Sequence, residues 1–329
     1  MAETKNNRAI TVKVYHGYGH QHNLVVYGHV LQGNLTGRKR YTTNALVNIF
    51  YLAKLFFIQP VPNQAIQLQW NDQLLTSKTE KDGFFKFEWQ SNKTVSAGWH
   101  ALQVNATDAQ SQLLASGIGK IFIPHATQYG FISDIDDTVL VSHSATTGRK
   151  LKTLFTKNPR SRKTFADVVK FYNLLASAHT EQVLLNPFFY VSSSEWNLYD
   201  DLNEFFKHNG LPKGAFMLSG IKKWYQLLQS GKSKHFGKLI RVVRILEAFP
   251  KQRFVLLGDN TQSDPETYVA IANKYPNNIV AIYIRNISSK KELATNTLLA
   301  SINNKAITTC HFKHTDEAIE HATSTGFIV

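Results

Sequence analysis

The sequence predicts two domains: a β-rich N-terminal domain, folded as a sandwich or a small barrel, followed by an α/β domain with a doubly wound parallel sheet. A length of 329 residues corresponds to about two domains. Hydrophobic residues make up 43% of the chain and charged residues 18%, which is enough to bury ordinary cores. The pattern of apolar residues changes after Pro124, from strand-like alternation to short apolar runs separated by helical periodicity. We therefore expect the domains to span residues 1–126 and 127–329.

The N-terminal domain is expected to consist mainly of strands. Apolar side chains alternate in residues 10–14, 24–26, 66–70, 99–106 and 121–123. A helix is expected near residues 45–58, with Asn44 as its cap. Its predicted apolar face consists of Leu46, Ile49, Phe50, Ala53 and Phe57. We expect this face to pack on the sheet, with a helix on a membrane surface as the alternative.

The C-terminal domain alternates strand and helix patterns. Apolar runs bounded by turn residues predict buried parallel strands at 129–133, 188–191, 254–257 and 279–284. Helical periodicity lies between them, at 165–175, 198–206 and 239–249. This alternation predicts βαβ units, in which ligands bind at the carboxyl ends of the strands.

Positive charge is concentrated in two segments. The chain carries a formal net charge of +14. Residues 138–166 contain seven Lys or Arg residues and no acid, and residues 205–246 contain nine and no acid. These segments are either solvated faces or a cationic surface that attracts phosphates, anionic lipid headgroups or nucleic acid.

Polar groups follow the predicted strands where a site should form. The sequence Asp134-Ile135-Asp136-Asp137-Thr138 follows the first strand, Ser192 follows the second, and Asp259 follows the third. Lys238 lies in the helix before that third strand. Asp134 can attack phosphorus as a nucleophile, while Asp136 handles the protons of the leaving group and of water.

A cation is expected between these carboxylates, because two carboxylates in one site otherwise repel each other. Oxygen ligands favour Mg²⁺, and Asp259 is the natural third acidic contact. Asp264 precedes Pro265, so it either caps a helix or supports the metal, and one residue can do both. Ser192 can donate a hydrogen bond to a phosphoryl oxygen, and Lys238 can neutralise charge in the transition state.

This set of motifs resembles the haloacid dehalogenase superfamily of phosphatases and phosphotransferases. The segments FISDIDDTVL, NPFFYVSSSEWNLYDDLNEFFKHNGLP and FVLLGDNTQSDPETY, with a lysine twelve residues before the proline of FP, are similar to the actin-patch-type phosphatidate phosphatases and their bacterial relatives. VVYGHV and DGFFKF extend the likeness into the N-terminal domain.

The resemblance implies roles for individual residues. Asp134 would form the aspartyl-phosphate, and Asp136 would be the general acid and base. Asp134, Asp259 and the backbone carbonyl of Asp136 would hold Mg²⁺, with Asp264 supporting the metal from farther out. Lys238 matches the expected lysine better than Lys234 does. Glu195 stands where the family would have proline, and it adds negative charge close to Ser192.

The sequence therefore predicts a Mg²⁺-dependent phosphatase that hydrolyses phosphatidate to diacylglycerol and phosphate. Two alternatives stay open: a phosphatase for a soluble or protein-borne phosphate, and an inactive module that binds membranes or nucleic acid. Expected partners are a phosphorylated lipid or small-molecule substrate and an anionic membrane surface, rather than nucleic acid. Without a signal-like apolar core near the start of the sequence, we expect a cytoplasmic protein, peripheral at a membrane.

Two other features of the sequence are candidate sites. Cys310 is the only cysteine, which excludes an intrachain disulfide and a four-cysteine zinc site. His16, His20 and His22 lie in a predicted hairpin without companion carboxylates, so a metal site there is disfavoured.

Overall fold

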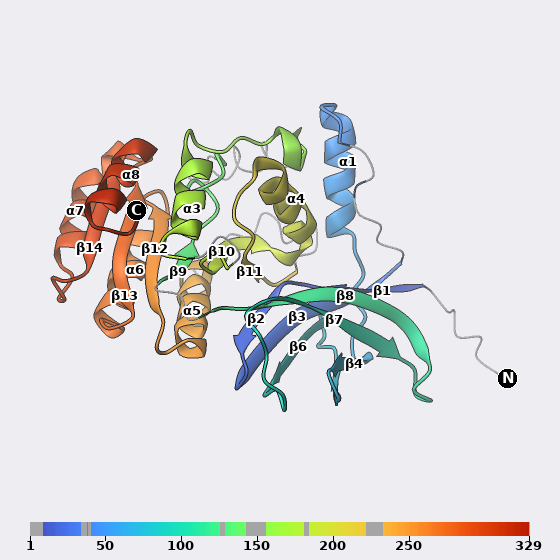
Figure 1. Ribbon diagram of the computed structural model, residues 1–329. Helices are drawn as coiled ribbons and strands as arrows, with labels where there is room; N and C mark the ends of the chain where they lie inside the picture. Colours follow the sequence, from blue (N-terminus) through green and yellow to red (C-terminus); the bar gives the residue numbers. More distant parts are fainter. Residues whose placement is uncertain are drawn as a thin grey trace. The chain divides into compact units, whose positions relative to one another are not determined.

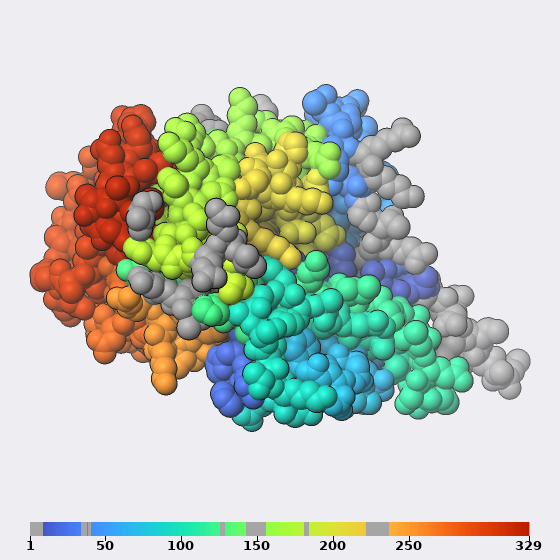
Figure 2. Space-filling model, viewed as in Figure 1, coloured from blue at the N-terminus to red at the C-terminus, as the bar shows by residue number. Residues whose placement is uncertain are grey.

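The computed structural model (Figures 1 and 2) describes residues 9–33, 38, 41–125, 129–142, 156–180, 184–221 and 233–328, the side chains of 233–236 excepted. Contacts divide the chain into two compact units. Unit 1 comprises residues 1–39 and 54–123, and unit 2 comprises residues 40–53 and 124–329.

Unit 1 is built from strands, as the alternating pattern predicts. They are β1 (Ile10–Val14), β2 (Gly17–His20), β3 (Asn23–Gln32), β4 (Ala65–Trp70), β5 (Gln73–Lys78), β6 (Phe84–Trp89), β7 (Gly98–Thr107) and β8 (Leu113–Ile123). They form one sheet in the order β1-β3-β2-β8-β7-β4-β5, with β6 paired to β3. All pairs are antiparallel except β2 with β8. The closure of this sheet into a sandwich or a barrel stays a prediction.

Unit 2 contains a six-stranded parallel sheet (Figure 1). Its strands are β9 (Tyr129–Ser133), β10 (Phe188–Glu195), β11 (Ala215–Ser219), β12 (Arg253–Asp259), β13 (Ile279–Arg285) and β14 (Thr308–Phe312). The four predicted strands are confirmed, whereas β11 and β14 were not predicted. The helices of this unit are α3 (Val168–Ser177), α4 (Tyr199–Asn209), α5 (Ser233–Ala248), α6 (Asp264–Lys274), α7 (Glu292–Ala300) and α8 (Thr315–Ser324).

The strand order of this sheet fixes where a ligand site can form. The order is β11-β10-β9-β12-β13-β14, so the chain leaves β9 toward β10 on one side and later returns to pair β12 on the other. Every neighbouring pair is parallel. Ligands of open parallel sheets bind beyond the carboxyl ends of the strands where the order reverses. In this sheet that position lies at the ends of β9 and β12.

Helix α1 (Ala45–Phe56) corrects one prediction. Asn44 caps it as expected, because its Oδ1 accepts hydrogen bonds from the backbone amides of Leu46 and Val47. The predicted packing face is wrong, since Leu46 and Phe50 are 76% and 77% exposed. The buried side chains are those of Asn48, Leu52, Leu55 and Phe56. They follow the same 3.6-residue period, and the amide of Asn48 finds hydrogen-bond acceptors on the buried side.

Among the described residues, no helix has both the length and the apolar composition needed to cross a bilayer.

Candidate active site

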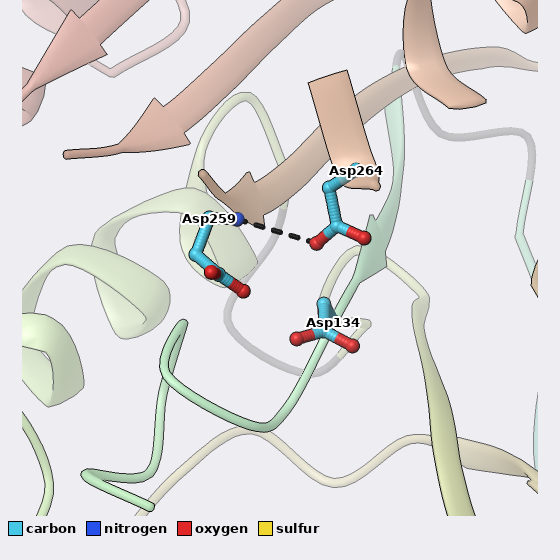
Figure 3. A group of neighbouring side chains, drawn as sticks. All are labelled: Asp134, Asp259 and Asp264. Atoms are coloured by element: carbon cyan, nitrogen blue, oxygen red, sulfur yellow. Dashed lines mark hydrogen bonds between the residues drawn. The ribbon is translucent and has the colours of Figure 1, made fainter. Parts of the chain in front are cut away.

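Three carboxylates meet at the carboxyl ends of β9 and β12. Asp134 follows the last residue of β9, Asp259 ends β12, and Asp264 begins α6. Each offers an oxygen, and these atoms all lie within 4.8 Å of one another (Figure 3). The exposed fractions of the three residues are 1%, 0% and 0%. The structure thus brings together three of the four predicted metal ligands through their side chains.

Lys238 of α5 lies in the same cluster. Its Nζ is 2.7 Å from Oδ1 of Asp134 and also contacts Oδ1 of Asp264. Burial lowers the pKa of Lys238, but the two carboxylates outweigh that effect and hold it above its usual value. The ammonium group therefore stays charged, as the predicted role of this lysine requires.

Three carboxylates share one lysine in the cluster, so negative charge would exceed positive charge if all three were ionised. Burial raises the pKa of Asp134 well above its usual value. The positive charge of Lys238 lowers this pKa, and the neighbouring carboxylates raise it further. Burial and Asp264 raise the pKa of Asp259 to about 7, while hydrogen bonds from Thr261 and the charge of Lys238 oppose the rise. Buried carboxylates with raised pKa values gain from a bound cation.

The donor set fits Mg²⁺. The side chains of the cluster offer carboxylate oxygens, and Mg²⁺ prefers such hard oxygen ligands. Asp134 and Asp259 lie on neighbouring strands, so their positions are fixed by the ladder between Ser133 and Leu257. A divalent cation would compensate the charge that Lys238 leaves unbalanced.

Asp136, the fourth predicted ligand, turns its side chain elsewhere. Its Oδ2 accepts hydrogen bonds from the hydroxyls of Ser192 (3.3 Å) and Ser194 (3.1 Å). The side chain therefore does not join the carboxylate cluster, which agrees with a ligand role for its backbone carbonyl alone. Ser192 also accepts a hydrogen bond from the amide of Ser194. This arrangement links Asp136, the predicted general acid and base, to Ser192, which is predicted to donate a hydrogen bond to a phosphoryl oxygen.

Asp264 is not the helix cap that one interpretation assigned to it. The N-cap of α6 is Ser263, and Asp264 is the first helical residue. Its carboxylate accepts a hydrogen bond from the backbone amide of Asp259 at 3.2 Å (Figure 3). It also contacts Nζ of Lys238. Its donors are therefore the backbone amide of Asp259 and the ammonium group of Lys238, as expected for a residue that supports the cluster rather than caps the helix.

Two further residues of the site were not predicted. The hydroxyl of Thr138 lies 3.3 Å from Oδ2 of Asp134 and 3.4 Å from Oδ2 of Asp259, within reach of both. Buried Arg285, at the end of β13, donates through Nε to the carbonyl oxygen of Thr138 (3.3 Å). Thr138 occupies a fixed place in the first motif, which was a usable signal. No signal in the sequence indicated Arg285, because its role depends on the position of β13 beside β12.

The basic segments are only partly described. Arg162 is buried against Asp201, and Lys238 is buried in the acidic cluster, so neither belongs to a cationic surface. Lys157, Arg160 and Lys163 are exposed. The other bases of residues 143–155 and 222–232, the side chain of Lys234 and most of the expected cover over the site lie outside the described residues.

The three N-terminal histidines form no metal cluster within the described part of the chain. His16 packs against Trp99, His20 accepts from the amide of His22, and His22 bonds to the side chain of Gln90. These contacts account for the histidines without a ligand.

Gly258 allows Asp264 to approach the end of β12, and this gives a first prediction. A Cβ at position 258 would lie 2.6 Å from Oδ2 of Asp264 and 2.7 Å from the ring of Tyr268. Gly258→Ala should therefore displace Asp264, destabilise the fold by about 1–3 kcal/mol and lower Mg²⁺-dependent turnover. Urea unfolding and phosphate-release assays measure the two effects.

Gly237→Ala is the matched control, since its Cβ would meet only the guanidinium of Arg241 at 3.5 Å. That variant should keep wild-type turnover although it precedes Lys238. Equal behaviour of the two variants would contradict the close packing at position 258.

Fold and site together define an α/β domain with a buried carboxylate cluster and a lysine at the reversal point of a parallel sheet. Residues 129–286, which contain all of these groups, match the family described as "Phosphatidate phosphatase APP1, catalytic domain". The match begins at β9 and ends just after β13.

Two curated relatives align over about half of the chain. "Phosphatidate phosphatase APP1" of Saccharomyces cerevisiae is 31% identical over 159 residues, 47% of this chain and 25% of that protein. An uncharacterised protein of Schizosaccharomyces pombe, C29B5.04c, is 26% identical over 166 residues, 48% of this chain and 25% of its own length. The chain thus aligns with about a quarter of each relative.

Among solved structures, a carbohydrate acetylesterase from Xanthomonas citri aligns with 95% of this chain and 73% of its own at 10% identity and a TM-score of 0.35. A likeness this weak supports no conclusion.

Proposed function

We propose that unit 2 is a Mg²⁺-dependent phosphatase of the haloacid dehalogenase type, with a doubly wound sheet, and that it hydrolyses phosphatidate to diacylglycerol and phosphate. The observation that carries the proposal is the meeting of Asp134, Asp259, Asp264 and Lys238 at the reversal point of the sheet. The family match over these residues and the name of the yeast relative support the substrate.

In this proposal, Asp134 is the nucleophile. One of its carboxylate oxygens attacks phosphorus, the bond to the ester oxygen breaks, and an aspartyl-phosphate forms. Asp136 gives a proton to the departing diacylglycerol oxygen. The serine hydroxyls that contact Asp136 hold its side chain away from the carboxylate cluster, toward the β10 side of the site.

The second half of the reaction reverses the proton transfer. Asp136 takes a proton from water, whose oxygen attacks phosphorus and releases phosphate together with free Asp134. Lys238 balances negative charge on the phosphoryl oxygens, and Ser192 donates a hydrogen bond to one of them. Mg²⁺, held by Asp134, Asp259 and the carbonyl of Asp136 with support from Asp264, would supply further charge neutralisation.

Thr138 and Arg285 act as positioning residues in this proposal. Thr138 lies within hydrogen-bond reach of both metal-binding carboxylates, and Arg285 fixes the carbonyl of Thr138. The guanidinium lies between the rings of Phe165 and Phe312, 4.5 and 4.8 Å from their centroids. Burial lowers the pKa of Arg285 to about 10, which leaves it charged at neutral pH.

The test compares substrates on the purified protein. Phosphate release is measured with phosphatidate in mixed micelles and with water-soluble phosphomonoesters, each with Mg²⁺ and with a chelator. We expect Mg²⁺-dependent release from phosphatidate to be the fastest. Faster release from a soluble ester would reject the lipid substrate, and no release from any ester would reject the phosphatase.

A further inference from the structure

Two serine hydroxyls contact the same carboxylate oxygen of Asp136. Ser192 and Ser194 are two residues apart at the end of β10, so their side chains point to the same side of the strand. Their Oγ atoms lie 3.3 and 3.1 Å from Oδ2 of Asp136, and each hydroxyl donates to that oxygen. The two serines and Asp136 are all buried. Two donors from one strand therefore share one acceptor.

Ser192 has a second demand on its hydroxyl. A serine hydroxyl carries one proton, so it donates one hydrogen bond. In this structure the proton of Ser192 points to Asp136, whereas the proposed function requires it to point to a phosphoryl oxygen. Rotation about the Cβ–Oγ bond redirects the proton and leaves Oγ in place, where it accepts from the backbone amide of Ser194 (2.9 Å). A bound phosphoryl group would therefore take the hydroxyl of Ser192 away from Asp136.

Ser194 has no such second demand. Among the described residues, Oδ2 of Asp136 is the only hydrogen-bond partner of its hydroxyl. The proposed reaction assigns this hydroxyl no contact with the substrate. The contact between Ser194 and Asp136 can thus persist while Ser192 changes partner.

The backbone that carries the two serines is fixed from the side of β11. The register of β10 with β11 shifts between Val191 and Glu195, so the ladder does not hold the serine segment. Instead, the hydroxyl of Ser219, at the end of β11, donates to the carbonyl oxygen of Ser193 (3.0 Å). Arg241 of α5 donates through Nη2 to Oγ of Ser219 (3.1 Å). These contacts anchor the segment independently of Asp136.

We propose that Ser194 is a positioning residue for the general acid, which keeps the carboxyl group of Asp136 in place after Ser192 has turned to the phosphoryl group. This inference rests on the proposed function, because it needs an acid at Asp136 and a phosphoryl group at Ser192. When the bond from phosphorus to the ester oxygen breaks, the proton of the Asp136 carboxyl group passes to that oxygen. Both serines contact Oδ2, so Oδ1 carries this proton and the contact with Ser194 lasts through the transfer.

The test compares alanine variants of the two serines, which should differ in their kinetics. Ser194→Ala should lower kcat for phosphatidate by about 10- to 100-fold and leave KM within about twofold of the wild type, because the acid is misplaced while the substrate loses no contact. Ser192→Ala should raise KM at least about fivefold, because a donor to the phosphoryl group is lost.

Ser91→Ala is the matched control. This serine of unit 1 is 5% exposed, against 6% for Ser194, and its hydroxyl donates to the carbonyl oxygen of Lys93 at 2.7 Å. The variant removes a buried, hydrogen-bonded hydroxyl outside the site, so kcat and KM should stay at the wild-type values. An equal loss of kcat in Ser91→Ala and Ser194→Ala would overturn the inference.

Binding of inorganic phosphate, measured by calorimetry with Mg²⁺ present, separates positioning from a damaged site. Ser194→Ala should bind phosphate like the wild type, and Ser192→Ala at least about fivefold more weakly. If Ser194→Ala loses phosphate binding together with kcat, Ser194 has a structural role and the inference is wrong. A kcat within twofold of an active wild type would also overturn it, and the proposed function would stand. A wild type that releases phosphate from no ester would reject the proposed function itself.

Discussion

The Asp134→Asn variant should lose phosphate release by at least about 10,000-fold, the scale seen when a nucleophile is removed from an enzyme. The amide keeps the size of the side chain but cannot attack phosphorus. Steady-state phosphate release from phosphatidate, with Mg²⁺ present, measures the effect. Turnover within tenfold of the wild type would contradict the assignment of Asp134 as the nucleophile.

The same variant should keep its fold in the presence of a chelator. Burial, opposed by Lys238 and reinforced by the neighbouring carboxylates, raises the pKa of Asp134, so the folded state disfavours its charged form. A neutral amide removes that repulsion, and the free energy of unfolding should not fall. Asp167→Asn is the matched control: this exposed residue has a φ of 56°, which asparagine tolerates, and the variant should keep full turnover.

The Lys238→Met variant should lose both stability and activity. The ammonium group is the partner of Asp134 and Asp264, and its removal leaves buried carboxylates without that partner. Breaking a buried pair from one side costs about 3–5 kcal/mol. Turnover should fall by about 100- to 1,000-fold, the usual effect of losing one group that stabilises transition-state charge. Chemical unfolding with a chelator and phosphate release with Mg²⁺ measure the two effects.

A double variant separates charge balance from packing. If uncompensated charge is the cause, Lys238→Met/Asp264→Asn should be more stable than Lys238→Met alone, because one unpaired carboxylate has been removed. Added Mg²⁺ should likewise restore part of the stability of Lys238→Met. A Lys238→Met protein that unfolds like the wild type in chelator would contradict the charge balance described for this cluster.

The parallel sheet was predictable where its strands are buried on both faces. The runs at 188–191, 254–257 and 279–284 are apolar throughout, and acidic residues stand at the ends of two strands, Asp134 directly after β9 and Asp259 at the end of β12. The two strands that were missed, β11 and β14, lie at the edges of the sheet, although β11 (AFMLS) is an apolar run whose first four residues are buried. The sequence TTCHF of β14 is mostly half-exposed, so it lacks an apolar run.

The site was predictable from strand ends, but its internal contacts were not. The order of the motifs indicated that Asp134, Asp259 and Lys238 would meet, since parallel strands end at one edge. The inward direction of Asp264 depends on Gly258, which leaves room for its carboxylate. Arg285 acts through the carbonyl of Thr138, a contact between residues 147 positions apart that no local pattern encodes.

Helix α1 shows why periodicity alone could not choose a buried face. Leu46 and Phe50 belong to one row of apolar side chains spaced four residues apart, and Leu52 and Phe56 belong to another. The structure buries the row that contains Asn48, whose amide binds two backbone carbonyls. The deciding interaction is polar and long-range, so counting apolar positions indicated the wrong face.

The most direct test of the account is a crystal soaked in Mn²⁺, with the ion located by its anomalous scattering. We expect one peak at bonding distance from a carboxylate oxygen of Asp134, a carboxylate oxygen of Asp259 and the backbone carbonyl oxygen of Asp136. A fully occupied Mn²⁺ elsewhere in unit 2, with these oxygens bound to no ion, would contradict it.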